Sequence, residues 1–147
     1  MSGITLLVED PKWRSHRGLL PRLTKAAEAA RRSARLKGGC TILLADDRKL
    51  RALNLDFRGK DKATNVLSFP GDGSYGGDIA IAHGVTAKEA KAAAKTFADH
   101  AAHLVVHGVL HLAGYDHEKP KDARVMEPLE VKILKRLGIA DPYAAAL

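Results

Sequence analysis

The sequence predicts a single α+β domain over residues 1–147, in which a mixed sheet of about four strands packs with about five helices. Three observations carry this prediction. Short β-type runs and longer amphipathic segments follow one another in the order β-α-β-α-β-β-α-α-α. Hydrophobic residues make up 46% and charged residues 28% of the chain, which are ordinary values for globular proteins. A length of 147 residues suits one domain with a substantial core.

The first half of the chain alternates strands and helices. We expect strands at Ile4–Val8 and Cys40–Ala45, because both are short apolar runs with loop-like flanks. Residues 22–36, rich in Ala, Lys and Arg, predict a helix that stops at a pair of glycines. Asp46 is a suitable N-cap for a further helix over residues 47–56.

The second half begins with two strands, at residues 65–70 and 78–82, and a glycine-rich connection joins them. This short connection predicts that the two strands pair antiparallel. The tetrad Thr-Ala-Lys-Glu at residues 86–89 fits a capping box and predicts a helix over residues 86–96. Helices over residues 98–113 and 121–137 complete the fold.

The lone cysteine and the lack of long apolar runs predict a cytoplasmic protein. Cys40 has no partner for an internal disulfide, which fits a reducing compartment, and its place at the start of a strand predicts a buried, inert thiol. The N-terminal residues lack the basic and apolar regions of a signal peptide. No run reaches the 18 apolar residues typical of a membrane span, so no membrane partner is expected.

Three histidines in eleven residues form the pattern H-x-x-x-H-x-x-G-x-x-H, from His107 through His111 to His117. Residues four apart on a helix project from one face, so His107 and His111 can bind one ion. Gly114 can adopt the left-handed conformation that ends a helix, and the chain can then return with His117. Three such ligands on one Zn²⁺ leave a fourth position for water, which is the catalytic pattern.

Two other histidines lie earlier on the same predicted helix. His103 is one turn before His107, and we expect it to pack or to contact a ligand rather than to bind the ion. We expect His100 to face solvent. A single histidine on an apolar helix face is more often a hydrogen-bonded core residue than a ligand, whereas the complete three-histidine pattern predicts a metal site.

The pattern lacks the glutamate of zinc peptidases, which follows the first ligand in H-E-x-x-H and acts as general base. Gly108 stands in that place. Phosphodiester cleavage depends less on such a base, because it needs a metal-activated water and cations on the phosphoryl oxygens. Arg58 is a candidate cation, since a guanidinium binds phosphate in a bidentate manner. An ion pair of Arg58 with Asp56 or Asp61 on the surface is the alternative.

The net charge of +7 at pH 7 favours a polyanionic partner, although many proteins are basic for solubility alone. Basic residues concentrate on the helix over residues 22–36 and in the section that follows it. With three Tyr, three Phe and one Trp, the sequence does not indicate a broad aromatic platform for stacking bases.

Most of the chain resembles the YbeY family of bacterial rRNA maturation factors. The similarity is carried by HLVVHGVLHLAGYDH (residues 103–117), FRGKDKATNVLSFP (57–70) and GGDIAIA (76–82), and extends to MEPLE (126–130) and DPY (141–143). Phe57, Ala63 and Gly76 depart from the residues usual in the family (Tyr, Pro and Leu). We expect these departures to affect packing rather than chemistry.

The resemblance implies a metal-dependent endoribonuclease specific for single strands. It would act in maturation of the small-subunit rRNA 3′ end and in ribosome quality control, with rRNA precursor, the small ribosomal subunit and its associated factors as partners and no DNA. It also implies one zinc ion on His107, His111 and His117, and assigns Arg58 as the functional arginine. A zinc metallopeptidase-like hydrolase and a non-catalytic ribosome-binding factor with a structural zinc remain alternatives. Whether water or the RNA 2′-OH attacks the phosphodiester stays open, as does a role for Asp116 in orienting a ligand imidazole.

Overall fold

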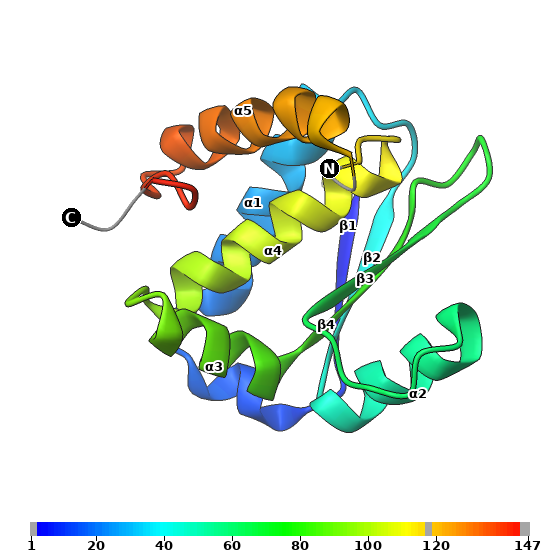
Figure 1. Ribbon diagram of the computed structural model, residues 1–147, viewed down its shortest axis with the longest axis vertical. Coiled ribbons are helices and arrows are strands. Elements are labelled where there is room, and N and C mark those ends of the chain that lie inside the picture. The colour runs from blue at the N-terminus through cyan, green and yellow to red at the C-terminus, as the bar shows by residue number, and fades with distance from the viewer. Residues whose placement is uncertain (1–2, 117–118, 145–147) are drawn as a thin grey trace.

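The computed structural model describes residues 3–116 and 119–144, which form one four-stranded sheet with helices on both faces (Figure 1). The strands are β1 (Ile4–Val8), β2 (Cys40–Ala45), β3 (Val66–Pro70) and β4 (Gly77–Ala82), in the order β1-β2-β4-β3. β1, β2 and β4 run parallel, and β3 pairs antiparallel with β4. The predicted mixed α+β sheet and the antiparallel pairing of its last two strands are confirmed.

The described residues form a short 3-10 helix and five α-helices. They are η1 (Pro11–Ser15), α1 (Leu19–Ser33), α2 (Asp47–Arg58), α3 (His83–Ala92), α4 (Phe97–Leu112) and α5 (Pro120–Arg136). Asp46 caps α2 as predicted, because its carboxylate accepts a hydrogen bond from the Lys49 backbone N–H at 2.8 Å. None of the helices in the described part of the chain has the length and apolarity needed to cross a bilayer.

The start of α3 differs from the prediction. The helix begins at His83, three residues before Thr86, and no side-chain hydrogen bond caps it. The Thr86 hydroxyl instead donates at 2.6 Å to the carbonyl of Ala82, the residue just before the helix, and Thr86 is fully buried. The predicted capping box is therefore wrong, because the Thr86 hydroxyl binds the Ala82 carbonyl and does not cap a helix that begins at Thr86.

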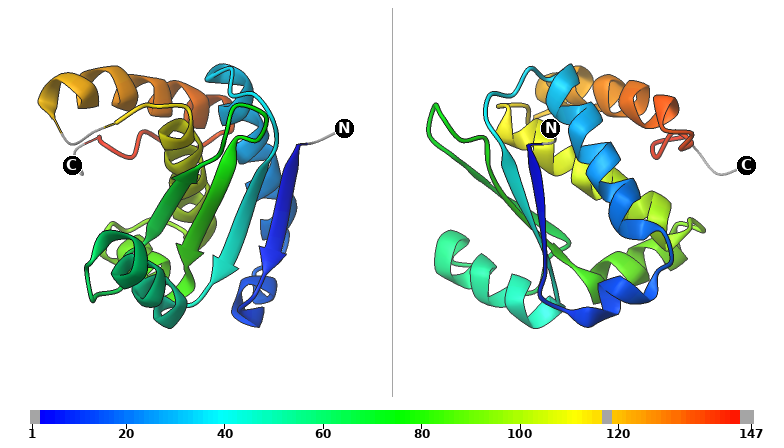
Figure 2. Two further views of the ribbon diagram at one scale, coloured as in Figure 1. Left: turned by 90° about the vertical axis from the view of Figure 1, so that its right-hand side faces the viewer. Right: turned by 180° about the vertical axis from the view of Figure 1, so that it is seen from behind.

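The two faces of the sheet are covered unequally (Figure 2). α1 and α4 pack on one face over the larger core cluster, which includes Ile42, Ile79 and Ile81, while α5 lies outside them. α2 covers part of the other face, where Ala80 and Leu50 belong to a second, smaller cluster. Successive residues of β4 thus alternate between the two cores, as the period of a strand requires.

Cys40 is buried with 1% of its surface exposed, as predicted. Burial is the largest influence on its thiol and raises the pKa, which Arg31 partly opposes. A thiol that is both inaccessible and protonated is a poor nucleophile. Cys40 is therefore part of the core rather than of a reactive site.

α4 lies unusually close to the sheet at Gly108. A Cβ atom at this position would come within 3.1 Å of Ile79 Cγ2 and 3.3 Å of Ser68 Oγ, closer than side chains normally approach. The Ser68 hydroxyl donates to the Gly108 carbonyl at 3.1 Å, which fixes β3 against the helix. A small residue is favoured here, because the helix packs closely on the strands at this point.

We predict that Gly108→Val lowers the free energy of unfolding by about 1–3 kcal/mol, because a branched side chain must push Ile79 and Ser68 aside. Urea unfolding followed by circular dichroism measures the change. Gly73→Val is the matched control, since Gly73 lies in a loop with no heavy atom near its absent Cβ, and it should change stability by less than about 0.5 kcal/mol. Equal effects of the two variants would contradict the close packing of α4.

Candidate metal centre

α4 carries the histidines of the predicted site. The helix begins after Thr96, whose hydroxyl accepts a hydrogen bond from the Asp99 backbone N–H at 3.1 Å. His107 and His111 project from one face, and their Nε2 atoms lie 3.0 Å apart. Gly114 follows the helix with a φ of 97°, so the predicted left-handed turn is present. The third predicted ligand, His117, lies outside the described residues.

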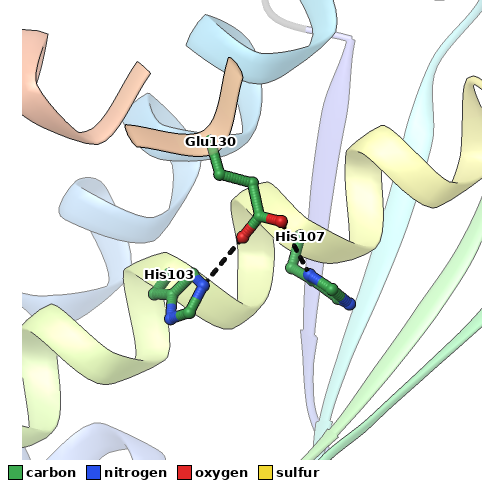
Figure 3. A group of neighbouring side chains, drawn as sticks. All are labelled: His103, His107 and Glu130. Atoms are coloured by element: carbon green, nitrogen blue, oxygen red, sulfur yellow. Dashed lines mark hydrogen bonds and ion pairs between the residues drawn. The ribbon is translucent and has the colours of Figure 1, made fainter. Parts of the chain in front are cut away.

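A buried carboxylate from α5 meets the same helix (Figure 3). Glu130 is fully buried, and its two oxygens reach different histidines of α4. Oε2 lies 2.8 Å from His103 Nε2, and Oε1 lies 3.2 Å from His107 Nδ1. The Tyr143 hydroxyl donates to Oε2 at 2.9 Å, so three side chains surround this one acid.

Glu130 stays ionised in this environment. Burial alone would raise the pKa of Glu130, but the hydrogen bonds and charges of His103 and His107 outweigh burial and lower the pKa to about 2. Burial, together with the charge of Glu130, raises the pKa of Tyr143, so its hydroxyl remains a donor. His103, His107 and Tyr143 therefore all donate hydrogen bonds to a carboxylate that can only accept them.

This direction of hydrogen bonding assigns the nitrogens of His107. Because the carboxylate can only accept, Nδ1 carries the proton, and in a neutral imidazole Nε2 then presents a lone pair. That lone pair faces Nε2 of His111 across 3.0 Å. A carboxylate that holds the far nitrogen of an imidazole is the usual support of a metal-binding histidine, because it fixes the tautomer and the ring orientation.

Two sets of donor atoms at this place could hold an ion, and they share His107. One set is the facing Nε2 pair of His107 and His111. The other set is His103, His107 and Glu130, whose donor atoms lie within 4.8 Å of one another. Nitrogen and carboxylate oxygen donors suit zinc and other divalent transition metals. Residues 3–116 and 119–144 thus contain a possible metal-binding group, which includes a carboxylate from outside the histidine pattern.

The histidines line an open cleft of about 980 Å³ that runs between α4, β3 and the segment after α5. Arg58, the last residue of α2, is exposed and also lines it. Asp61 pairs with Arg51 at 2.7 Å, and within residues 3–116 and 119–144 no ion pair occupies Arg58. The structure therefore brings Arg58 and the histidine pair to one cavity.

The prediction for His100 is wrong. Its side chain is only 11% exposed, and Nε2 lies 2.9 Å from Glu89 of α3. His103 was expected to pack or to contact a ligand. It binds one oxygen of Glu130, and the other oxygen of Glu130 binds His107. Both histidines are held by acidic residues from other helices, which the pattern of α4 alone does not reveal.

Glu130 could have been noticed in the sequence. It occupies the apolar stripe of its helix, four residues after Met126 and four before Leu134, both fully buried. An acidic residue in such a stripe requires a buried partner. The sequence signals the need for that partner, although it does not identify the histidines that satisfy it.

The fold and the cleft together define the class of protein: a single α+β domain in which helix α4 presents histidines of a possible metal-binding group to an open cleft. The chain belongs to the YbeY family, because the family model described as Endoribonuclease YbeY matches residues 14–138. The resemblance seen in the sequence is thereby confirmed.

Known members of the family are similar to this chain over most of their lengths. The chain is 50% identical over 136 residues to an endoribonuclease YbeY of Chelativorans sp. (strain BNC1), covering 87% of this chain and 83% of the relative. It is 45% identical over 148 residues to that of Maricaulis maris (strain MCS10), covering 97% and 92%. A solution structure of a Thermotoga maritima protein has a TM-score of 0.65 at 29% identity, covering 91% of this chain and 88% of the other.

We predict that Glu130→Gln lowers the free energy of unfolding of the metal-free protein by about 1–3 kcal/mol, because the charge is lost and one of the two oxygens that accept from the histidines becomes a donor. Chemical unfolding of the two proteins provides the comparison. Glu127→Gln, one turn earlier on α5, is not fully buried and should stay within about 0.5 kcal/mol of wild type. A Glu130 variant as stable as the Glu127 variant would show that the carboxylate does not hold the histidines.

Proposed function

We propose that this chain is a zinc-dependent endoribonuclease that cleaves single-stranded RNA in the cleft between α4 and β3. The observation that carries the proposal is the pair of facing Nε2 atoms, 3.0 Å apart, in a cleft that Arg58 also lines. Relatives named endoribonuclease YbeY support the reaction class. By the same similarity we propose the small-subunit rRNA 3′ end as substrate, the ribosomal subunit and its factors as partners, and the cytoplasm as location.

His107, His111 and His117 would hold the ion, one zinc per chain. Two Zn–N bonds of about 2.0–2.1 Å at a tetrahedral angle place their nitrogens about 3.4 Å apart, close to the observed separation of the His107 and His111 Nε2 atoms. In this arrangement Glu130 orients His107 from Nδ1 rather than binding the ion. A bound zinc supplies Lewis acidity, which polarises a phosphoryl oxygen and lowers the pKa of a water molecule.

The side chains of the cleft suit RNA. The Arg58 guanidinium can bind the non-bridging oxygens of a phosphate and stabilise the charge that develops on them. Phe57, 66% exposed, and Tyr143, 43% exposed, line the same cavity and offer aromatic surfaces to unpaired bases. A net charge of +7 favours a polyanion as substrate.

The peptidase alternative is disfavoured by the packing at Gly108. Gly108 supplies no carboxylate to act as general base, and Ile79 and Ser68 of the sheet crowd the place of its absent Cβ. The position points to the strands rather than into the cleft. The tight packing therefore favours glycine at this point of the pattern, and glycine lacks the group on which H-E-x-x-H peptidases depend.

We predict that His111→Ala weakens zinc binding at least about 100-fold, whereas His103→Ala weakens it less than about tenfold, because His103 binds the carboxylate that orients His107 and is not one of the proposed ligands. Isothermal titration with Zn²⁺ in the presence of a competing chelator gives both affinities. Loss of binding in His103→Ala with normal binding in His111→Ala would place the ion in the His103–His107–Glu130 group instead.

We predict that Arg58→Ala reduces kcat/KM on a single-stranded RNA about 10²- to 10³-fold without changing zinc content. Arg51→Ala, in the same helix, removes only a surface ion pair with Asp61 and should keep wild-type activity within about twofold. Cleavage is followed on end-labelled RNA, with a duplex of the same sequence and His111→Ala as inactive controls. Active Arg58 and His111 variants would overturn the proposed site, and inert wild-type protein would favour a ribosome-binding factor with a structural zinc.

The ends of the products identify the nucleophile. A 2′,3′-cyclic phosphate requires attack by the neighbouring 2′-OH, whereas a 5′-phosphate with a free 3′-OH requires attack by water. Mass spectrometry of the fragments distinguishes the two. In either case Arg58 has the same role, because charge accumulates on the non-bridging oxygens in both reactions.

A further inference from the structure

A second pair of histidines faces Nε2 to Nε2, away from the cleft. His16 follows η1 and His83 is the first residue of α3, and their Nε2 atoms lie 2.9 Å apart. Neither side chain lines the cleft. His16 stacks on Phe97, the first residue of α4, which precedes His107 by ten residues, or about 15 Å along the helix axis. The two histidine pairs therefore lie at separate places, near opposite ends of α4.

Aromatic side chains hold both imidazole rings of this second pair. The ring of His16 lies parallel to that of Phe97, with an interplanar angle of 2° and centroids 4.0 Å apart. The ring of His83 meets Trp13 edge to face, with centroids 5.3 Å apart. Trp13 is fully buried, and its Nε1 donates to the Ala45 carbonyl at 2.8 Å. The core thus fixes the two rings, and ligands that are already in place lose little conformational freedom on binding.

The charges around the pair favour a cation. The groups whose charges act on His83 include two carboxylates and one ammonium, those of Asp10, Asp47 and Lys12. The Asp47 carboxylate also accepts a backbone N–H in the first turn of α3 at 2.9 Å, which offsets the positive end of the helix dipole. Burial, and next the charge of His16, lower the pKa of His83, so its imidazole is neutral at pH 7 and offers a lone pair.

The separation of the two nitrogens is close to what one ion requires. Two nitrogen ligands of a tetrahedral zinc lie about 3.4 Å apart, so the rings of His16 and His83 would part by about half an ångström from the observed 2.9 Å. In the metal-free protein one Nε2 donates to the other. Ion binding moves that proton to Nδ1 of the same ring, which changes the tautomer but not the number of protons. Within residues 3–116 and 119–144 no third histidine, cysteine or acidic side chain forms a ligand group with the pair, so water would fill the other positions.

We propose that His16 and His83 form a second metal site, which takes one divalent transition-metal ion through the two Nε2 atoms. Imidazole ligands suit zinc, nickel and copper, and their affinity is highest for Cu²⁺. With two protein ligands the site is weaker than the proposed three-histidine site, and it fills only when metal exceeds one ion per chain. The competing explanation is a plain hydrogen bond that ties η1 to α3 and binds no ion.

Trp13 reports directly on the site. It is the only tryptophan in the sequence, its ring centroid lies 5.3 Å from that of His83, and Cu²⁺ bound at such short range quenches indole fluorescence. We expect Cu²⁺ at micromolar concentration to quench the fluorescence of the zinc-loaded wild type in a saturable manner. The His111→Ala variant, which lacks a proposed ligand of the cleft, should give the same quenching curve.

His16→Phe is the decisive variant, because a phenyl ring keeps the stack on Phe97 and removes the nitrogen ligand. We expect this variant to need at least about tenfold more Cu²⁺ for half-maximal quenching, since one of two protein ligands is lost. His83→Gln should behave in the same way. A circular dichroism spectrum of each variant shows that folded proteins are compared.

Equal quenching curves for wild type and His16→Phe, or quenching of the wild type only at millimolar Cu²⁺, would overturn the inference and leave the plain hydrogen bond. If both variants unfold, nuclear magnetic resonance of the wild type decides. Substoichiometric Cu²⁺ should broaden the ring signals of His16 and His83, and sharp signals would overturn the inference. None of these measurements uses RNA cleavage, so the outcome is independent of the proposed endoribonuclease function.

Discussion

The contact between the backbone of α4 and the sheet at Gly108 is the constraint on which the site depends. Because Gly108 has no side chain, Ile79 and Ser68 lie close to the place that a Cβ would take, and the Ser68 hydroxyl donates to the Gly108 carbonyl. The helix is thereby held at one depth and one rotation. Its histidines fall on a different face and line the open cleft. A packing requirement within the fold thus sets the direction in which the reactive nitrogens point.

A second constraint comes from α5, which supplies the buried carboxylate of Glu130. An ionised group without contact to water is costly unless it is fully hydrogen-bonded, and here His103, His107 and Tyr143 satisfy it. The same contacts determine the tautomer of His107. The stability of the α4–α5 packing and the tautomer of His107 therefore depend on one side chain.

Much of this arrangement could be predicted from the sequence because the information is local. His107 and His111 share one helix, so a spacing of four residues is enough to bring them together. The same holds for the cap at Asp46 and for the left-handed turn at Gly114. Strand pairing in the second half followed from the short connection between β3 and β4.

The rest depended on contacts between elements far apart in the chain. Glu130 is 23 residues from His107, and only the packing of α5 on α4 joins them. His100 was expected in solvent because its partner, Glu89, comes from a different helix. Thr86 has the local pattern of a cap, yet its hydroxyl binds Ala82 within a longer helix. The pattern of side chains within one helix or strand predicts which residues share a face. It does not predict which residues of other helices or strands pack against that face.

The most direct test of the central claim is the position of zinc in a crystal of the zinc-loaded protein, located by anomalous scattering at the zinc edge. We predict one strong peak between the Nε2 atoms of His107 and His111, with Glu130 remaining on Nδ1 of His107. A peak bonded to His103 and Glu130 instead, or no peak near α4, would contradict it.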